Sequence, residues 1–318
     1  MAVDVLRYRH GGAESWGVVD GTQVRPVLGS FPSTRSFVLD AADAVRSGEH
    51  PLGHPIAVEE VEVLSPVTTD GQFICQAINY RTHMAESGFD PRTSPFNVFF
   101  RKASSSIAGP TTDIVSPPGV EYLDHEVEIG LVLRRDVDSA TTVTGAGLAD
   151  HVAALVALND VSARDLQLAE TQFYRSKSFR TFGPTGPHLT LVDADDLARF
   201  EEIRLRLWVN GELRQDELAA DMVHGPAATL TELSSVQDWR AGDLLATGTP
   251  GGCALHVPAF PLRAIAQVVS PARRVALVRR SAARNRRRLL PGDLVELHVG
   301  TDDGAIDLGR QRTRVVAG

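Results

Sequence analysis

Apolar and polar residues alternate in short runs along the first part of the chain, with glycine-containing turns between the runs. Since successive side chains of a strand point to opposite faces, this alternation predicts strands. The predicted strands cover residues 3–8, 15–19, 23–28 and 58–64. Apolar residues at helical spacing predict one helix over Phe37–Arg46. We therefore expect a small β-rich N-terminal domain over residues 1–65 and a larger domain over residues 66–318.

Strands also dominate the rest of the chain, and the predicted helices there are short. An apolar run over residues 203–209 ends at Asn210-Gly211, which is a strong signal for a tight hairpin turn. A helix is predicted over residues 227–236, and short strands over residues 243–246 and 294–299. This mixture favours an α+β fold over a regularly alternating α/β fold.

The stretch Tyr122–Leu133 combines acidic residues with the pattern of a strand. Asp124, Glu126 and Glu128 fall on one face of this strand, which runs directly into apolar residues. Burial and mutual repulsion would protonate some of these carboxyl groups unless a cation neutralises them.

A second apolar run, Val152–Leu158, stops at Asn159-Asp160. Together the two stretches offer three carboxylates, Glu126, Glu128 and Asp160, without a cysteine or an evident histidine partner. Oxygen ligands of this kind suit magnesium, calcium or manganese better than zinc. Taken alone, however, such an acidic pair is more typical of a solvent-exposed strand face, because Asp and Glu are rarely buried.

Residues 79–86 are predicted to include a helical turn, in which His83 and Glu86 face the same side. A carboxylate beside an imidazole raises the basicity of the ring, and such a pair can activate water as a general base. By itself, the same spacing is more often a surface salt bridge.

Arg164, Gln167 and Lys177 form a third candidate group, shortly after Asp160. Arginine can hold a carboxylate through two parallel hydrogen bonds, glutamine can donate to a carbonyl, and lysine supplies a point charge. A helical turn capped by Ser162 is predicted to carry the first two. Solvent-exposed helix residues are the alternative interpretation.

Composition and charge narrow the class of protein. A chain of 318 residues with 43% hydrophobic residues can bury a large core, and a net charge of -8 argues against a general nucleic-acid binder. Two cysteines are too few for a disulfide framework, which favours a reducing compartment. The sequence shows neither a signal-peptide pattern nor an apolar stretch of membrane-spanning length. We expect a cytoplasmic protein that binds neither nucleic acid nor membrane.

Residues 253–290 differ from their surroundings because they are rich in Ala, Val and Arg, with Arg279-Arg280 and Arg286-Arg287-Arg288 close together. A basic amphipathic helix on the surface or at a subunit contact is the main interpretation. A phosphate- or membrane-directed patch is the alternative, since clustered arginines attract such anions.

Several ordered motifs resemble the fumarylacetoacetate hydrolase family. Asn-Asp-Val-Ser-Ala-Arg-Asp at residues 159–165, combined with Glu-Val-Glu at residues 126–128, is the most specific of them. The other matching segments are residues 79–83, 100–102, 177–179, 183–187, 248–250 and 291–293. The likeness covers most of residues 66–252 and resumes from residue 291.

The resemblance implies a mixed β-roll catalytic domain behind the small N-terminal domain, assembled as a homodimer. It implies that Glu126, Glu128 and Asp160 bind Mg²⁺, with Mn²⁺ or Ca²⁺ as alternatives. It also implies that His83 and Glu86 activate water and that Lys177 takes part in catalysis. The residues expected to contact the substrate are Arg164, Gln167, Thr249, Tyr80 and Lys102.

Two features depart from the family pattern. Arg180 stands where many relatives have Asp, which would alter the substrate pocket or the pairing of Lys177. The segment 253–290 follows the Gly-Thr-Pro loop, and would cover the pocket or extend a subunit contact.

From this resemblance we expect a metal-dependent hydrolase that cleaves a carbon–carbon bond in a 2,4-dioxo acid, such as an acylpyruvate, through a metal-bound enolate. Decarboxylation, isomerisation or dehydration of a 2-oxo acid is the alternative within the family. A Schiff base on Lys177 and a non-catalytic protein that binds a 2-oxo acid or a partner protein are two further alternatives.

Overall fold

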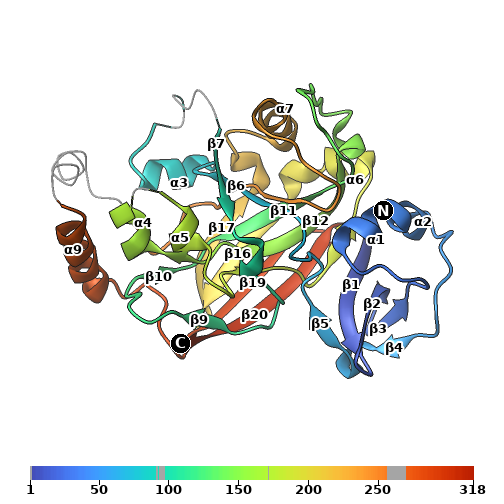
Figure 1. Ribbon diagram of the computed structural model, residues 1–318, viewed down its shortest axis with the longest axis horizontal. Coiled ribbons are helices and arrows are strands. Elements are labelled where there is room, and N and C mark those ends of the chain that lie inside the picture. Colours follow the sequence, from blue (N-terminus) through green and yellow to red (C-terminus); the bar gives the residue numbers. More distant parts are fainter. Residues whose placement is uncertain (1, 91, 93–96, 171, 256–269) are drawn as a thin grey trace.

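The computed structural model describes residues 2–90, 92, 97–170, 172–255 and 270–318. Strands make up the centre of the molecule, and short helices lie around it (Figure 1). This is the mixed, strand-rich α+β fold that the sequence predicts.

The larger sheet joins the N-terminal segment to the centre of the molecule. Its strands follow one another in the order β4 (Ile56–Ala57), β3 (Gln23–Pro26), β2 (Ala13–Asp20), β1 (Val3–His10), β15 (Leu189–Leu191), β12 (Val152–Asn159), β11 (Val127–Leu133), β18 (Leu244–Ala246), β6 (Phe73–Ala77) and β7 (Val98–Lys102). A further strand, β5 (Glu62–Leu64), pairs with β1. Because β1 also pairs with β15, the N-terminal strands extend the main sheet. A division into domains at residue 65 stays a prediction.

The second sheet has five strands among the described residues. They are β17 (Glu212–Leu218), β16 (Arg204–Val209), β19 (Leu294–Gly300), β20 (Asp307–Ala317) and β9 (Ile114–Ser116), in that order. The predicted hairpin between β16 and β17 is confirmed. Asn210 and Gly211 at its tip have φ values of 52° and 80°, the left-handed conformation that a tight hairpin turn of this kind requires.

Two further sheets in the described part of the chain consist of two short strands each. β10 (Leu123–Asp124) pairs with β13 (Ser162–Ala163), and β8 (Ile107–Ala108) pairs with β14 (Gly183–Pro184). The first of these pairs brings the residues before β11 next to the residues after β12.

The strands β11 and β12 are buried on both faces along their whole length. On one face, Leu131 and Leu155 pack in a core cluster that includes Leu205 and Leu297 of the second sheet. On the other face, apolar residues of both strands pack in a cluster with the N-terminal segment. Burial on both sides explains why these strands read as nearly continuous apolar runs.

The α-helices in the described part of the chain are mostly short, and residues of the first two pack in a core cluster with strands of the larger sheet. These helices are α1 (Thr34–Asp40), α2 (Ala42–Arg46), α3 (Arg81–Glu86), α4 (Arg164–Glu170), α5 (Tyr174–Lys177), α6 (Ala194–Ala198), α7 (Pro226–Val236) and α9 (Pro271–Arg284). None of the helices in the described part of the chain is long and apolar enough to cross a membrane.

Three local predictions are corrected by the structure. The single helix over residues 37–46 is two helices, because the backbone leaves helical geometry at Ala41, where φ is -136°. The strand expected over residues 58–64 begins with a 3₁₀ turn, and only Glu62–Leu64 pairs. Ser162 does not cap a helix: it lies in β13, and its hydroxyl donates to the carbonyl of Asp160 at 2.9 Å.

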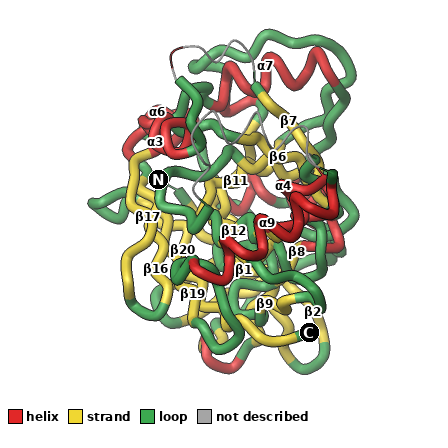
Figure 2. The backbone as a smooth tube through the Cα atoms, turned by 90° about the vertical axis from the view of Figure 1, so that its left-hand side faces the viewer, coloured by secondary structure: helices red, strands yellow, loops and turns green. Residues whose placement is uncertain are grey.

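The basic segment contains the predicted helix, although its residues 256–269 lie outside the described part of the chain. This helix, α9, lies beside α4 (Figure 2). Arg279 of α9 pairs with Asp165 of α4, with Nε 3.2 Å from Oδ2. The main interpretation, a basic helix on the protein surface, agrees with this position.

Candidate metal centre and active site

The antiparallel pairing of β11 and β12 brings the three predicted carboxylates together. Glu126 directly precedes β11, Glu128 is the second residue of that strand, and Asp160 directly follows the end of β12. The main chain of Asp160 donates to the carbonyl of Glu126 at 2.8 Å, which fixes this junction. One ligand oxygen from each of the three side chains lies within 4.8 Å of the others, and all three residues are buried.

Two buried lysines pair with these acids. Lys177, at the end of α5, places Nζ 2.7 Å from Glu126 Oε2 and 2.5 Å from Asp160 Oδ2. Lys102, at the end of β7, places Nζ 2.5 Å from Asp160 Oδ1 and donates to the carbonyl of Phe182. Both oxygens of Asp160 therefore have a cationic partner.

Arg164, at the start of α4, links the same acids to a further carboxylate. Its Nε donates to Asp124 Oδ2 at 2.8 Å, and its Nη2 lies 2.5 Å from Glu126 Oε1. Its Nη1 donates to Gln167 Oε1 at 2.9 Å. Asp124 therefore holds the arginine and is not a member of the three-carboxylate group.

Two residues that support the site were given no role from the sequence. Asp124 also accepts hydrogen bonds from the main chains of Ala254 and Leu255, so one carboxylate joins Arg164 to the beginning of the basic segment. Gln215 of β17 donates from Nε2 to Thr249 Oγ1 at 2.8 Å. The sequence analysis placed Asp124 on the same strand face as Glu126 and Glu128 without predicting its pairing with Arg164, whereas no sequence signal marks Gln215.

The acids differ in protonation because their partners differ. Burial opposes ionisation of Glu126, but Arg164 and Lys177 outweigh it and hold the pKa of Glu126 well below its usual value of 4.5. Burial together with the charges of Asp160 and Glu126 raises the pKa of Glu128 well above that value. Burial opposes the charge of Lys177, yet Asp160 and Glu126 raise its pKa, so the ammonium form is retained.

A divalent cation fits this set of side chains. Among the described residues, the buried group contains four carboxylates, on Asp124, Glu126, Glu128 and Asp160, but three cationic side chains, on Lys102, Arg164 and Lys177. Glu128 accepts a hydrogen bond from the main chain of Gly248 at 2.9 Å and forms no ion pair with any of these cations. An all-oxygen donor set with excess negative charge matches a hard cation such as magnesium, manganese or calcium.

His83 and Glu86 both lie on α3, as predicted, but have different partners. His83 lines the cavity above the acids, and burial lowers its pKa below the usual value of 6.5. The carboxylate of Glu86 accepts a hydrogen bond from the main chain of Gly252, with Oε2 at 2.9 Å. No hydrogen bond joins Glu86 to His83 in the described part of the structure. Glu86 therefore fixes the glycine loop to α3 instead of polarising the imidazole directly.

The cavity beside the acids has a volume of about 270 Å³. Seven of the residues singled out from the sequence line it: His83, Glu126, Glu128, Arg164, Gln167, Lys177 and Thr249. The hydroxyl of Thr249 donates to the carbonyl of Val127 at 2.9 Å, which aligns its loop along β11.

Tyr80, Lys102 and Arg180 do not line this cavity in the described structure. Tyr80 is fully buried in the main core cluster, so its ring supports the site and does not face the substrate. Lys102 is buried and contacts Asp160, so it belongs to the buried acid–base group and not to the cavity wall. Arg180 is exposed, so its departure from the family pattern does not reshape the cavity wall directly.

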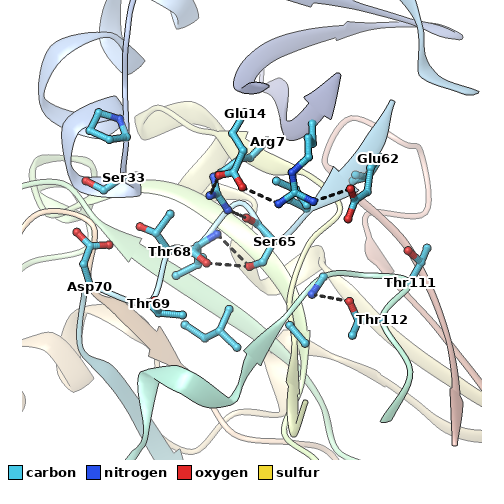
Figure 3. Close-up of a pocket in the computed structure, with 18 residues that line it drawn as sticks. Arg7, Glu14, Ser33, Glu62, Ser65, Thr68, Thr69, Asp70, Thr111 and Thr112 are labelled. Carbon is cyan, nitrogen blue, oxygen red and sulfur yellow. Dashed lines mark hydrogen bonds and ion pairs between the residues drawn. The ribbon is translucent and has the colours of Figure 1, made fainter. Parts of the chain in front are cut away.

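A larger cavity, of about 850 Å³, lies elsewhere, between the N-terminal strands and the loops after β5 and β8 (Figure 3). It is lined by charged residues that pair with one another. Arg9 places Nη1 2.7 Å from Glu62 Oε2 and Nη2 2.7 Å from Glu14 Oε1, and Arg7 pairs with Glu14. None of the site residues predicted from the sequence lines it. The smaller cavity is the candidate active site because the predicted site residues line it, although the other cavity has the larger volume.

Comparison with known proteins shows the family of the chain. The fumarylacetoacetate (FAA) hydrolase C-terminal family matches residues 72–316. A protein of Burkholderia ambifaria, provisionally named a hydrolase, is 33% identical over 264 residues, which cover 81% of this chain and 90% of that protein.

Two solved structures share the fold over nearly their whole length. One, from Mycobacterium abscessus and provisionally named a 2-hydroxyhepta-2,4-diene-1,7-dioate isomerase, is 28% identical, with a TM-score of 0.73 and coverage of 100% of this chain and 99% of that one. The other is maleylpyruvate hydrolase from Sphingobium sp. SYK-6, in complex with manganese (II) ion and pyruvate. It is 21% identical, with a TM-score of 0.70 and coverage of 99% of each chain.

The family match spans most of the chain and includes the converging acids, the cavity and the loop that closes on α3. The chain belongs to the fumarylacetoacetate hydrolase family.

Proposed function

We propose that this protein is a metal-dependent hydrolase that cleaves a carbon–carbon bond in a 2,4-dioxo acid of the acylpyruvate type. The observation that carries the proposal is the convergence of Glu126, Glu128 and Asp160 beside a cavity that is also lined by His83 and Lys177. The pyruvate and manganese named with the maleylpyruvate hydrolase structure support a site of this kind.

Glu126, Glu128 and Asp160 would hold the metal, which we propose to be magnesium, with manganese or calcium as alternatives. When bound, such an ion supplies a Lewis acid that polarises carbonyl oxygens. Its charge would also offset the excess negative charge of the buried group and favour ionised Glu128.

His83 is the proposed general base. Because burial lowers its pKa, the imidazole is neutral near pH 7 and can accept a proton from water. The water oxygen attacks the distal carbonyl carbon, and the bond between that carbon and the neighbouring methylene breaks. The electron pair of the broken bond goes to the methylene carbon, which takes up a proton, and the products are a carboxylic acid and pyruvate.

Lys177 and Arg164 are proposed to stabilise the negative charge that develops on the pyruvate half. Both line the cavity and both retain their charge when buried, since acidic partners hold them. Fixed cationic groups that face developing charge give a large electrostatic gain in a water-poor site. A Schiff base on Lys177 is disfavoured, because its amine is held in the protonated form.

A second candidate reaction within the family is isomerisation, favoured by the isomerase name of the M. abscessus structure. Decarboxylation and dehydration of a 2-oxo acid remain alternatives on the same residues. A non-catalytic role is disfavoured because His83, two of the three acids and two cationic side chains line one cavity, with Asp160 close to the two acids.

The test is a screen of acylpyruvates and other 2-oxo acids with added magnesium or manganese, followed by product analysis in ¹⁸O-water. Hydrolysis predicts one ¹⁸O atom in the carboxylic acid product and loss of turnover after chelation, with recovery when metal is restored. Full turnover after exhaustive chelation would reject the metal-dependent mechanism. Conversion without solvent oxygen in a new carboxylate would favour isomerisation or decarboxylation instead. The expected homodimer stays a prediction, which light scattering would check.

A further inference from the structure

The cavity has an apolar wall beside its charged residues. Phe100 and Phe173 form this wall with their ring centroids 4.9 Å apart, and Leu168 and Leu255 also line the cavity. Phe89 lines it as well and is 46% exposed, which places it towards solvent. Apolar side chains on this scale bind an apolar group by removing it from water.

The apolar wall begins directly next to the proposed catalytic groups. Lys177 Nζ lies 5.2 Å from the centroid of the Phe100 ring. A substrate whose pyruvate end meets Lys177 would therefore extend its acyl group along the phenylalanines.

The cationic side chains that line the described part of the cavity are those of Arg164 and Lys177. Arg164 is already held by Asp124 and Glu126, and Lys177 by Glu126 and Asp160. Under the proposed function both cations serve the 2-oxo acid group, so neither is left for a second carboxylate at the apolar wall. A carboxylate placed there would lose hydration without gaining an ionic partner, which is costly.

We infer that the site selects 2-oxo acids with a single carboxylate and an uncharged, apolar acyl tail, either alkyl or aryl, over acids that end in a second carboxylate. This inference rests on the proposed function, because it assumes that the charged end of the cavity receives the 2-oxo acid group.

The experiment compares two probes of equal chain length, 2-oxohexanoate and 2-oxoadipate, by isothermal titration calorimetry with the full chain in MgCl₂. Neither probe has a 4-oxo group, so neither is cleaved and affinity is measured apart from turnover. We expect 2-oxohexanoate to bind at least about tenfold more tightly. Equal or tighter binding of 2-oxoadipate, or no binding of 2-oxohexanoate, would overturn the inference.

The outcome is separable from that of the proposed function. Cleavage of acylpyruvates combined with a preference for 2-oxoadipate would leave the proposed function standing and reject the apolar tail. A preference for 2-oxohexanoate without cleavage of any acylpyruvate would support the tail assignment and reject the hydrolase.

A matched pair of variants tests the wall itself. Phe173→Arg places a cation on the apolar wall and should raise the affinity for 2-oxoadipate by about fivefold or more relative to 2-oxohexanoate. Phe173→Leu keeps the wall apolar and should preserve the wild-type preference. The preference is a ratio of two affinities in one protein sample, so a partly unfolded variant still reports it. An unchanged ratio in folded Phe173→Arg would show that the tail does not reach this wall.

Discussion

Two groups of paired acids and bases in this protein look alike in distance but differ in surroundings. In the buried group, Lys177 lies 2.5–2.7 Å from Asp160 and Glu126. In the larger cavity of Figure 3, Arg9 lies 2.7 Å from both Glu14 and Glu62. The side chains of Lys177 and Glu126 are 3% and 6% exposed, whereas those of Arg9 and Glu62 are 40% and 61% exposed.

This difference decides what each group can do. Water competes for the charges in the larger cavity, so those ion pairs contribute little to stability. When such a pair is broken, water solvates the charge that is left. Water cannot replace a lost partner of a buried charge. The buried group also has one carboxylate more than it has cationic side chains, and Glu128 forms no ion pair among the described residues. Short ion pairs alone therefore do not mark a functional site, whereas burial with unbalanced charge does.

The largest expected effect is the loss of activity after removal of one buried acid. Asp160→Ala removes a proposed metal ligand and should lower kcat/KM about 10³-fold or more, equivalent to roughly 4 kcal/mol of transition-state stabilisation. Glu62→Ala removes an exposed acid of the larger cavity and should leave kcat/KM unchanged. Steady-state kinetics with manganese titration would measure both. Asp160→Ala with more than a tenth of wild-type activity would contradict the proposed metal site.

The second effect concerns the proposed base. His83→Ala should lower kcat by about 10²- to 10⁴-fold, the usual range for a general base. Since a lowered pKa keeps His83 neutral down to a lower pH, wild-type kcat should be constant from pH 6.5 upwards and fall below it. The exposed His10 provides a control, and His10→Ala should keep the wild-type pH profile. If the residual kcat of His83→Ala falls over the same acidic pH range as the wild-type kcat, another group is responsible for that fall.

The third effect compares stability in the two groups directly. Lys102→Met leaves one oxygen of buried Asp160 without its partner and should lower the free energy of unfolding by roughly 3–5 kcal/mol. Arg9→Met breaks exposed pairs and should leave the midpoint of urea unfolding nearly unchanged. Both proteins would be measured without added metal. Equal shifts of the two midpoints would remove the distinction between the groups.

The smallest effect is a gain in stability. The pKa of Glu128 is raised by folding, so the folded protein binds its proton more tightly than the unfolded chain and loses stability as pH rises above about 4.5. Glu128→Gln removes this loss and should raise the free energy of unfolding of the metal-free protein at pH 7–8 by roughly 1–3 kcal/mol. The gain should shrink towards pH 4.5. Urea unfolding across this range, with chelator present, would reveal a pH-independent difference if the assignment is wrong.

Much of the site could be predicted because local patterns fix it. The positions of Glu126, Glu128 and Asp160 at strand ends offered three candidate ligands. The family resemblance favoured one buried cluster over an exposed strand face, and the antiparallel pairing of β11 and β12 forms this cluster. The hairpin at Asn210-Gly211 follows equally from residues that tolerate the required backbone conformation.

Long-range partners could not be predicted in this way. Glu86 has the correct spacing to meet His83, yet it binds the main chain of Gly252, which is 166 residues away in sequence. Gln215 reaches Thr249 from the second sheet, and nothing in its local sequence indicates this contact. Apolar residues on both sides of Ala41 pack in the same core cluster, so apolar spacing alone does not reveal the break between the two helices.

The pairing of both oxygens of Asp160 with lysines has a consequence for how the enzyme matures. Because these ammonium groups already neutralise the acid in the folded chain, folding need not wait for an ion to arrive. If the proposed metal dependence holds, scarcity of the metal in a growing cell would reduce the active fraction of the protein, while the amount of folded protein stayed the same.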